Sequence, residues 1–277
     1  MTQNRWCNLF LTSDSGTLQP QTVIATLQQA LTDAGYTAYD AFGRLPGRAY
    51  TQSVRLFAAP LHAGWMRIIA EEGLPPLVLG KLAADYTCVQ VRLTNDDVQI
   101  DVYAKGAAVE DIAAALVPYL RAGKTEGDVR SALVEPQITV IDTEPEEFLD
   151  GNVLPEDVQQ MATKIDKRDF DKMFERMSGK LFGRVAGNRD EAQALIQQAQ
   201  SVDWNTPHGW KAQAFMDALS LPLDWREPTF SALSSAYGLH ARRQRKPDAK
   251  LYPGDDKAMN AVPDALDYIP IFAGKDA

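Results

Sequence analysis

The clearest pattern in this chain is a pair of short segments in which apolar and polar residues alternate. In CVQVRL, residues 88–93, and VQIDVYA, residues 98–104, every second residue is aliphatic. A period of two places every second side chain on one face of a β-strand. The polar residues 94–97 between the two segments are typical of a tight turn. The sequence therefore predicts a β-hairpin whose strands each bury one face.

Similar patterns predict further strands and three helices in the N-terminal half. The remaining strands are expected at residues 5–12, 54–59 and 65–71. Residues 60–64 are expected to form the loop between the last two strands. Apolar residues at spacings of three and four predict helices at residues 20–34, 75–85 and 109–121. Pro20 suits the first turn of a helix, and Gly35 suits the residue that follows its end.

These elements follow one another in the order β-α-β-β-α-β-β-α, which predicts an α+β fold. The first six elements have the order of a ferredoxin-like fold, an antiparallel sheet with helices on one face. A duplicated β-α-β-β unit is the alternative, and the sequence does not separate these two folds. Either fold hosts unrelated activities and supports no functional conclusion.

An acidic segment separates this predicted sheet from a C-terminal part with a helical pattern. Residues 131–163 hold eight Asp or Glu residues and no Lys, Arg or His. Because like charges repel, the segment is expected to be an extended, solvated linker. The alternatives are a docking strip for a basic surface and, at residues 137–142, a short edge strand. We predict an α+β sheet domain at residues 1–134, an acidic linker at 135–156, and a mainly α-helical domain with an extended C-terminal tail at 157–277.

The C-terminal part contains the motif Asp-Trp-x-x-Pro twice, at residues 203–207 and 224–228. An apolar stripe at helical spacing follows each proline, and proline is favoured at the first position of a helix. The motif is therefore expected to mark two helix starts, capped by Thr206 and by Asp224, with each Trp folded back on its helix. The sharper alternative is an aromatic binding cage made of Trp204, Trp210 and Trp225.

Two further segments of the C-terminal part carry positive charge. Residues 170–185 have an apolar stripe at helical spacing, and a Lys or Arg recurs every four residues along the same predicted helix. The run HARRQRKPDAK, residues 240–250, is expected to be a solvated helix end, where cations complement the helix dipole. Pairing with the acidic linker and binding of an anionic ligand are the alternatives. In the tail, YIPIF, residues 268–272, is expected to act as an anchor.

Net charge and apolar content narrow the class of protein. The net charge is −9, and residues 1–150 carry −8 of it. An acidic half disfavours nucleic acid as its partner, because phosphate binding needs clustered positive charge. No apolar run approaches the ~20 residues that cross a bilayer, and the first residues lack the pattern of a secretory signal. The protein is therefore expected to be cytoplasmic, with no membrane partner.

The sequence contains no recognisable motif for a metal, a cofactor or a catalytic nucleophile. The three histidines lack the spacing of metal ligands, and there is no phosphate loop and no Gly-x-Ser-x-Gly turn. No cofactor and no metal are therefore expected. Cys7 and Cys88 are expected to be buried thiols, with a bridge or a reactive thiol as the alternatives.

One loop offers candidate ligand-binding residues. GRLPGRAYTQS, residues 43–53, contains Arg44 and Arg48, whose guanidinium groups are suited to hold a carboxylate or a phosphate. Together with His62, these two arginines are the candidate ligand-binding residues. The alternative is a plain connecting loop.

Three functions are compatible with these patterns. The first is a non-catalytic binding or regulatory protein that acts through contacts with another protein or with a second copy of the chain; segregated charge and the lack of a reaction motif favour it. The second is a small-molecule enzyme, a hydrolase or transferase, with Arg44, Arg48 and His62 in a site between the two domains. The third and weakest is nucleic-acid binding through residues 164–184 and 242–250.

Overall fold

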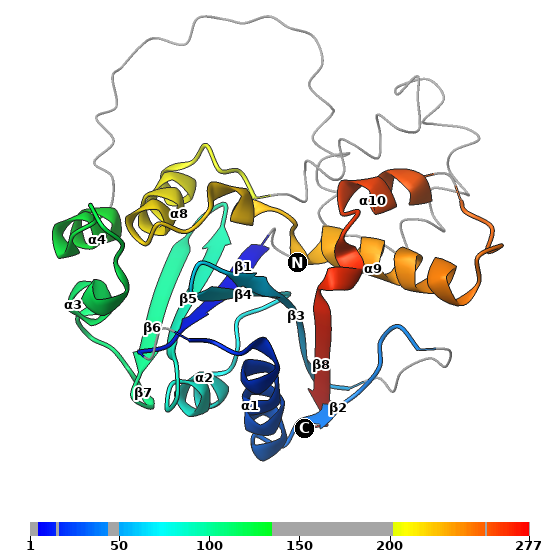
Figure 1. Cartoon of the computed structure of the whole chain (residues 1–277), viewed down its shortest axis with the longest axis horizontal. Helices are drawn as coiled ribbons and strands as arrows, with labels where there is room; N and C mark the ends of the chain where they lie inside the picture. The colour runs from blue at the N-terminus through cyan, green and yellow to red at the C-terminus, as the bar shows by residue number, and fades with distance from the viewer. Residues whose placement is uncertain (1–4, 15–16, 44–49, 135–201, 253, 277) are drawn as a thin grey trace, which may run out of the picture.

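The computed structural model describes residues 5–14, 17–43, 50–134, 202–252 and 254–276. Within them, eight strands form one antiparallel sheet in the order β2-β8-β3-β4-β1-β5-β6-β7 (Figure 1). The strands are β1 (Arg5–Thr12), β2 (Thr37–Ala38), β3 (Gln52–His62), β4 (Trp65–Ala70), β5 (Thr87–Thr94), β6 (Val98–Ala104), β7 (Ala107–Ala108) and β8 (Ile269–Lys275). The mixed α+β class predicted from the sequence is confirmed.

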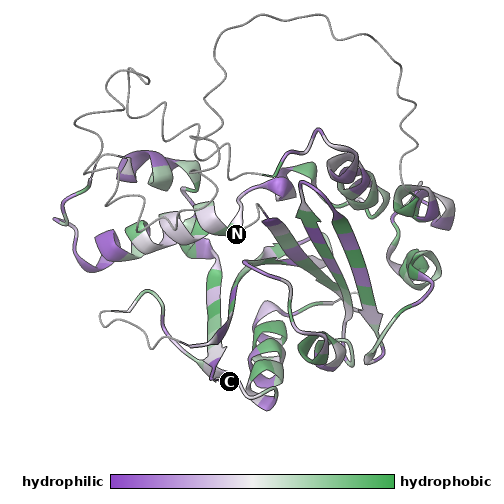
Figure 2. Cartoon of the chain, turned by 180° about the vertical axis from the view of Figure 1, so that it is seen from behind, coloured by the Kyte–Doolittle hydropathy of each residue, from purple (hydrophilic) through white to green (hydrophobic). Residues whose placement is uncertain are grey.

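Two helices cover one face of this sheet. α1 (Pro20–Asp33) and α2 (Pro76–Leu82) pack their apolar residues into a buried cluster with Cys7, Leu9 and Leu11 of β1. α1 begins at the expected proline, and the chain reverses after it at Gly35, which has a φ of 85°. Figure 2 shows apolar and hydrophilic residues alternating around α1, as helical spacing requires.

Helices also cover the opposite face, which the sequence-based prediction of helices on one face did not include. They are α3 (Ile112–Leu116), η1 (Val117–Tyr119), α4 (Glu126–Leu133), α8 (Pro207–Ala218), η3 (Leu223–Arg226), α9 (Phe230–Arg245) and η4 (Ala265–Asp267). α10 (Asp255–Ala261) packs on α9. Phe215 of α8 shares a buried cluster with Trp6 and Phe10. Leu233 of α9 shares a second buried cluster with Phe57. The C-terminal part therefore supplies much of the second helical layer.

Strand β5 lies between both helical layers, because Val89 belongs to the cluster with α8 and Cys88 to the cluster with α1 and α2. The hairpin itself is confirmed, with Val89 paired to Val102 across β5 and β6. The alternating pattern predicted one buried face, but Cys88 and Gln90 on the other face are buried as well. The Gln90 side chain accepts a hydrogen bond of 2.7 Å from the backbone N–H of Leu74, which offsets the cost of burying its amide.

The β3–β4 hairpin has a shorter turn than the sequence predicted. β3 runs to His62, and the turn consists of Ala63 and Gly64 alone, in place of a loop at 60–64. Both turn residues have positive φ angles, 53° and 85°, which is the conformation that matches the twist of a two-residue hairpin. The register shifts between Ala58 and Leu61, where the strand accommodates Pro60.

The C-terminal tail adds a strand to the sheet. It was expected to lie extended over the surface, but β8 pairs with β3 along its length and with β2 on its other side. Ile271 packs in the α1/α2 cluster and Phe272 in the α9 cluster, so β8 is anchored from both faces. The expectation that residues 268–272 anchor the tail agrees with this arrangement.

The predicted domain boundaries stay a prediction. The acidic linker 135–156, the edge strand at 137–142 and the helix at 170–185 lie outside the described residues, which stop at 134 and resume at 202. Within the described part, α8 and α9 pack on the sheet, and β8 is one of its strands.

The two Asp-Trp-x-x-Pro motifs begin helices in different ways. In the first, Pro207 starts α8 and the Thr206 hydroxyl accepts from the backbone N–H of Gly209, as predicted. In the second, Asp224 lies in η3, and α9 begins two residues after Pro228 with Thr229 as its cap. The correction has a simple cause: Thr229 supplies a better placed side-chain oxygen than an aspartate one turn away.

Both motif tryptophans pack on the sheet. The Trp204 ring lies 5.1 Å from that of Trp6 in an edge-to-face arrangement, and the Trp225 ring stacks on Phe10 at 5.6 Å. Trp210, the third member of the proposed cage, is 50% exposed on α8. These contacts favour the interpretation as aromatic plugs over that of a cage.

The basic run, residues 240–250, contains the end of helix α9. α9 ends at Arg245 with three arginines in its last turn, and Arg242 pairs with Asp255 at 3.1 Å.

Cys7 and Cys88 are both buried and free. Because Cys88 lies opposite Leu11, four residues along β1 from Cys7, the two are ~13 Å apart along the strand, too far for a bridge. Burial raises the pKa of Cys7 to about 12 and also raises that of Cys88, so neither thiol is reactive at neutral pH.

None of the described helices is long and apolar enough to span a bilayer.

The stacking of Trp225 on Phe10 leads to a stability prediction. Trp225→Ala is expected to lower the unfolding free energy by about 2 kcal/mol, less than for a fully buried Trp because the ring is only half-buried. Trp210→Ala is the matched control and should change it by no more than about 0.5 kcal/mol. Urea unfolding of the three proteins measures both values, and equal effects of the two changes would contradict the plug interpretation.

Candidate functional site

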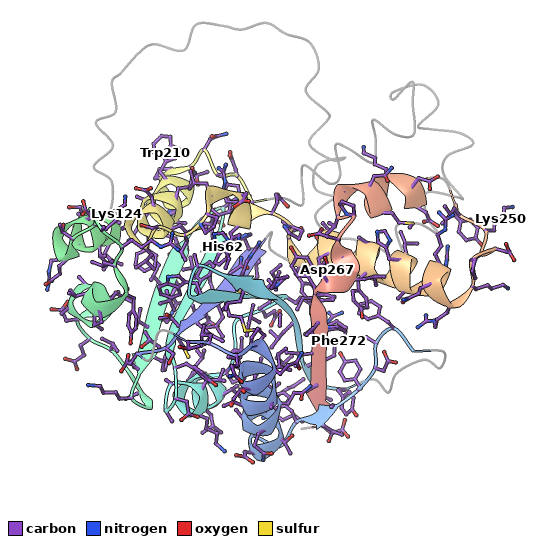
Figure 3. All side chains as sticks on the ribbon, in the orientation of Figure 1. His62, Lys124, Trp210, Lys250, Asp267 and Phe272 are labelled. Atoms are coloured by element: carbon purple, nitrogen blue, oxygen red, sulfur yellow. The ribbon has the colours of Figure 1, made fainter. Side chains whose placement is uncertain are left out.

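The three candidate residues from the sequence are not brought together in the described structure. His62 ends β3, is exposed, and places its ring 5.8 Å from that of Trp225 in an edge-to-face contact (Figure 3). Arg44 and Arg48 lie outside the described residues. Their proposed role in holding an anion therefore stays a prediction.

A hollow with a volume of about 1020 Å³ lies at one end of the sheet. We call it the polar cleft. Its walls are the end of β1, the β3–β4 turn, the start of β5, the β6–β7 turn and the α3–η1 segment. Its polar side chains include Thr12, Ser13, Asp14, Asp85, Tyr86, Thr87, Lys105, Tyr119 and Arg121. This volume lies at the upper end of the range typical of small-molecule sites.

Three side chains in the cleft form a hydrogen-bonded chain. The hydroxyl groups of Thr87 and Tyr119 lie 2.7 Å apart, and the Tyr119 hydroxyl donates to the carboxylate of Asp14. Because Tyr119 gives its proton to Asp14, the Thr87 hydroxyl is the donor in the first bond. The chain joins residues from β5, η1 and the segment after β1, and it fixes the position of the tyrosine hydroxyl.

The electrostatics keep this tyrosine neutral. Burial, reinforced by the hydrogen bond with Asp14, raises the pKa of Tyr119 above its ordinary value. A phenol whose pKa is raised does not act as a base near neutral pH. Tyr119 therefore offers the cleft a hydrogen-bonding hydroxyl rather than a tyrosinate.

Backbone contacts hold the remaining charged groups at the rim. The Arg121 guanidinium donates to the carbonyl of Ala63 at 3.0 Å, which ties the segment after η1 to the β3–β4 turn. Lys105 sits in the β6–β7 turn with a φ of 52°, next to Gly106, whose N–H donates to the carbonyl of Ala83 at 2.8 Å. Two cations and two carboxylates, Asp14 and Asp85, thus share one cleft.

Sequence reasoning missed this cleft. Tyr119 and Asp14 are separated by 105 residues, and no motif joins them. The one local signal was Pro118, which breaks the helix predicted at 109–121 into α3 and the short η1 and so turns Tyr119 towards the sheet.

Comparisons with known proteins do not extend this description: no family model, curated protein or solved structure matches the chain. Among the described residues, no group of three or more His, Cys, Asp or Glu side chains is placed to hold a metal ion.

The raised pKa of Tyr119 predicts how stability depends on pH. A tyrosine with a higher pKa in the folded state adds stability below its unfolded pKa of about 10, and this is lost as pH rises through the folded pKa. The unfolding free energy should therefore fall above about pH 10, and the fall should be shallower in Tyr119→Phe. Denaturant unfolding between pH 8 and pH 11 measures it; parallel curves for the two proteins would show that the folded structure does not perturb Tyr119.

Proposed function

We propose that this chain is a non-catalytic binding protein, and that the polar cleft holds a small polar molecule. The observation that carries the proposal is the convergence of the Thr87–Tyr119–Asp14 chain with charged groups of both signs in one hollow. A pre-arranged set of donors and acceptors lowers the entropy cost of binding a hydrogen-bonding ligand.

Contact with another protein is the second candidate, and it continues the expectation drawn from the sequence. The observation in its favour is the exposure of Trp210 on α8 and of Leu223 on η3, at 50% and 48%. Tryptophan is among the residues most enriched at the energetic centre of protein interfaces. An enzyme that uses His62 has less support, because the imidazole packs against an indole rather than lining the polar cleft.

For the fold, we propose the ferredoxin-like interpretation over the duplicated unit. Its support is the order β3-β4-β1-β5 at the centre of the sheet, with the helices α1 and α2 together on one face. In this interpretation β6 and β8 extend the central four strands at either edge.

A screen of polar metabolites by ligand-observed NMR tests the binding proposal. Compounds that bind the wild-type protein in the cleft should bind Tyr119→Phe at least about fivefold more weakly, because a hydrogen bond to the bound ligand is lost while the ring remains. Tyr252→Phe changes an exposed tyrosine that does not line the cleft, and it should leave binding unchanged. Compounds that bind all three proteins equally, or a screen without a compound that binds, would overturn the proposal.

A further inference from the structure

A second hollow lies at the opposite edge of the sheet, beside β2 and β8. Its volume is about 390 Å³, within the range of small-molecule sites. We call it the aromatic hollow. It is lined by Ala38, Tyr39, Asp40, Ala41, Phe42, Pro270 and Phe272. Three of these seven residues are aromatic, and Asp40 is the one with an ionisable carboxylate.

The three rings are held close together by backbone and packing contacts. The Phe272 ring lies 6.0 Å from that of Tyr39 and 5.4 Å from that of Phe42, tilted by 33° and 43° (Figure 3 labels Phe272). The N–H of Tyr39 donates to the carbonyl of Phe272 at 2.9 Å, which fixes the segment after β2 against β8. Phe42 also packs on Tyr237 of α9 at 4.7 Å. The rings are therefore fixed before any ligand arrives.

The charges around the hollow are of both signs. The Asp40 carboxylate accepts a hydrogen bond from the backbone N–H of Phe42 at 2.8 Å, which sets its orientation. Arg245 donates to the carbonyl of Phe42 at 2.6 Å, so one cation also lies at the rim. The positive charge of the nearby Arg55 is balanced by its ion pair with Glu71. The carboxylate is thus the charged group that lines the hollow, and the arginine opposes it from outside.

We propose that the aromatic hollow binds a small molecule that carries a quaternary ammonium group. Aromatic faces attract cations through the ring quadrupole, and ring cages are the common recognition site for quaternary ammonium. Such a group has no N–H to donate and therefore loses little when it leaves water for a wall of rings. Asp40 supplies the complementary charge.

Neighbouring rings of this chain already attract cations. The Lys275 ammonium lies 4.6 Å from the Tyr36 ring, and the Arg55 guanidinium lies 6.0 Å from the Phe230 ring. A lysine ammonium or a guanidinium is a poorer match for the hollow itself, because its N–H groups need acceptors and the rings provide none. This difference selects the quaternary group.

The test compares two probes of the same shape. Choline chloride and its uncharged carbon analogue, 3,3-dimethylbutan-1-ol, are titrated into the full chain and followed by ligand-observed NMR. We expect choline to bind at least about threefold more tightly than the neutral analogue, as cation–π attraction requires. Equal binding of the two probes, or no binding of choline up to about 50 mM, which corresponds to less than about 2 kcal/mol of binding free energy, would overturn the proposal.

Two charge variants are expected to change the affinity for choline in opposite directions. Asp40→Asn keeps an oxygen for the Phe42 N–H and removes the attractive charge, so choline affinity should fall by about threefold; Arg245→Gln removes the opposing charge, so it should rise. Tyr39→Leu, which replaces a half-buried ring by an alkyl group, should weaken choline more than the neutral analogue. Thermal melts of each variant confirm that it is folded. Two charge variants that shift affinity in the same direction would contradict the proposed site.

One variant distinguishes the proposal for the aromatic hollow from the proposal for the polar cleft. Tyr119→Phe changes the polar cleft, which shares no lining residue with the aromatic hollow, and it should leave choline binding unchanged. A loss of choline binding in Tyr119→Phe would move the site to the polar cleft and overturn the assignment to the aromatic hollow.

Discussion

A buried guanidinium on the central strand β4 is the interaction on which the rest of this structure depends. Arg67 is 1% exposed, and burial lowers its pKa to about 10, so it stays charged at neutral pH. Its Nε donates to the Asn8 side chain at 2.7 Å, and its two terminal nitrogens donate to the carbonyls of Glu227 and Pro228 at 2.6 and 3.1 Å. A buried charge is very costly when its donors lack partners. If the segment between η3 and α9 left the sheet, the two terminal nitrogens of Arg67 would therefore lose their carbonyl partners.

This constraint determines how the C-terminal part is arranged. The indole N–H of Trp6 donates to the carbonyl of Arg226 at 2.9 Å, so three consecutive carbonyls are held by side chains of the sheet. On either side of this polar contact lie the two apolar clusters of the same face, one with α8 and one with α9. The fixed segment places Trp225 on Phe10 and brings α9 to Phe42. The aromatic hollow thus depends on the docked C-terminal part, whereas the polar cleft is built within residues 12–121.

Local periodicity located several of the elements but not the segments that they pack against. Alternation located β5 and β6, and helical spacing located α1, because each pattern is set by a face that the same segment buries. The sequence around Arg67, WMRIIA, predicts a strand whose polar residue faces solvent. Arg67 can be buried only because the distant carbonyls of Glu227 and Pro228 accept hydrogen bonds from its guanidinium group. The same reason explains the missed strand β8 and the missed contact between Tyr119 and Asp14, since both join segments more than 100 residues apart. The candidate His62, expected in a loop at residues 60–64, is instead the last residue of β3, and its neighbour Trp225 comes from the C-terminal part.

Hydrogen exchange of Arg67→Lys tests this account most directly. Lysine keeps the buried charge, but its single nitrogen cannot reach three oxygens in the geometry of the guanidinium fork. We predict that backbone amides of α9 and β8 exchange at least about tenfold faster than in the wild-type protein, equivalent to about 1.4 kcal/mol, while those of α1 change less. Unchanged exchange in α9 and β8 would show that the apolar clusters alone hold the C-terminal part on the sheet.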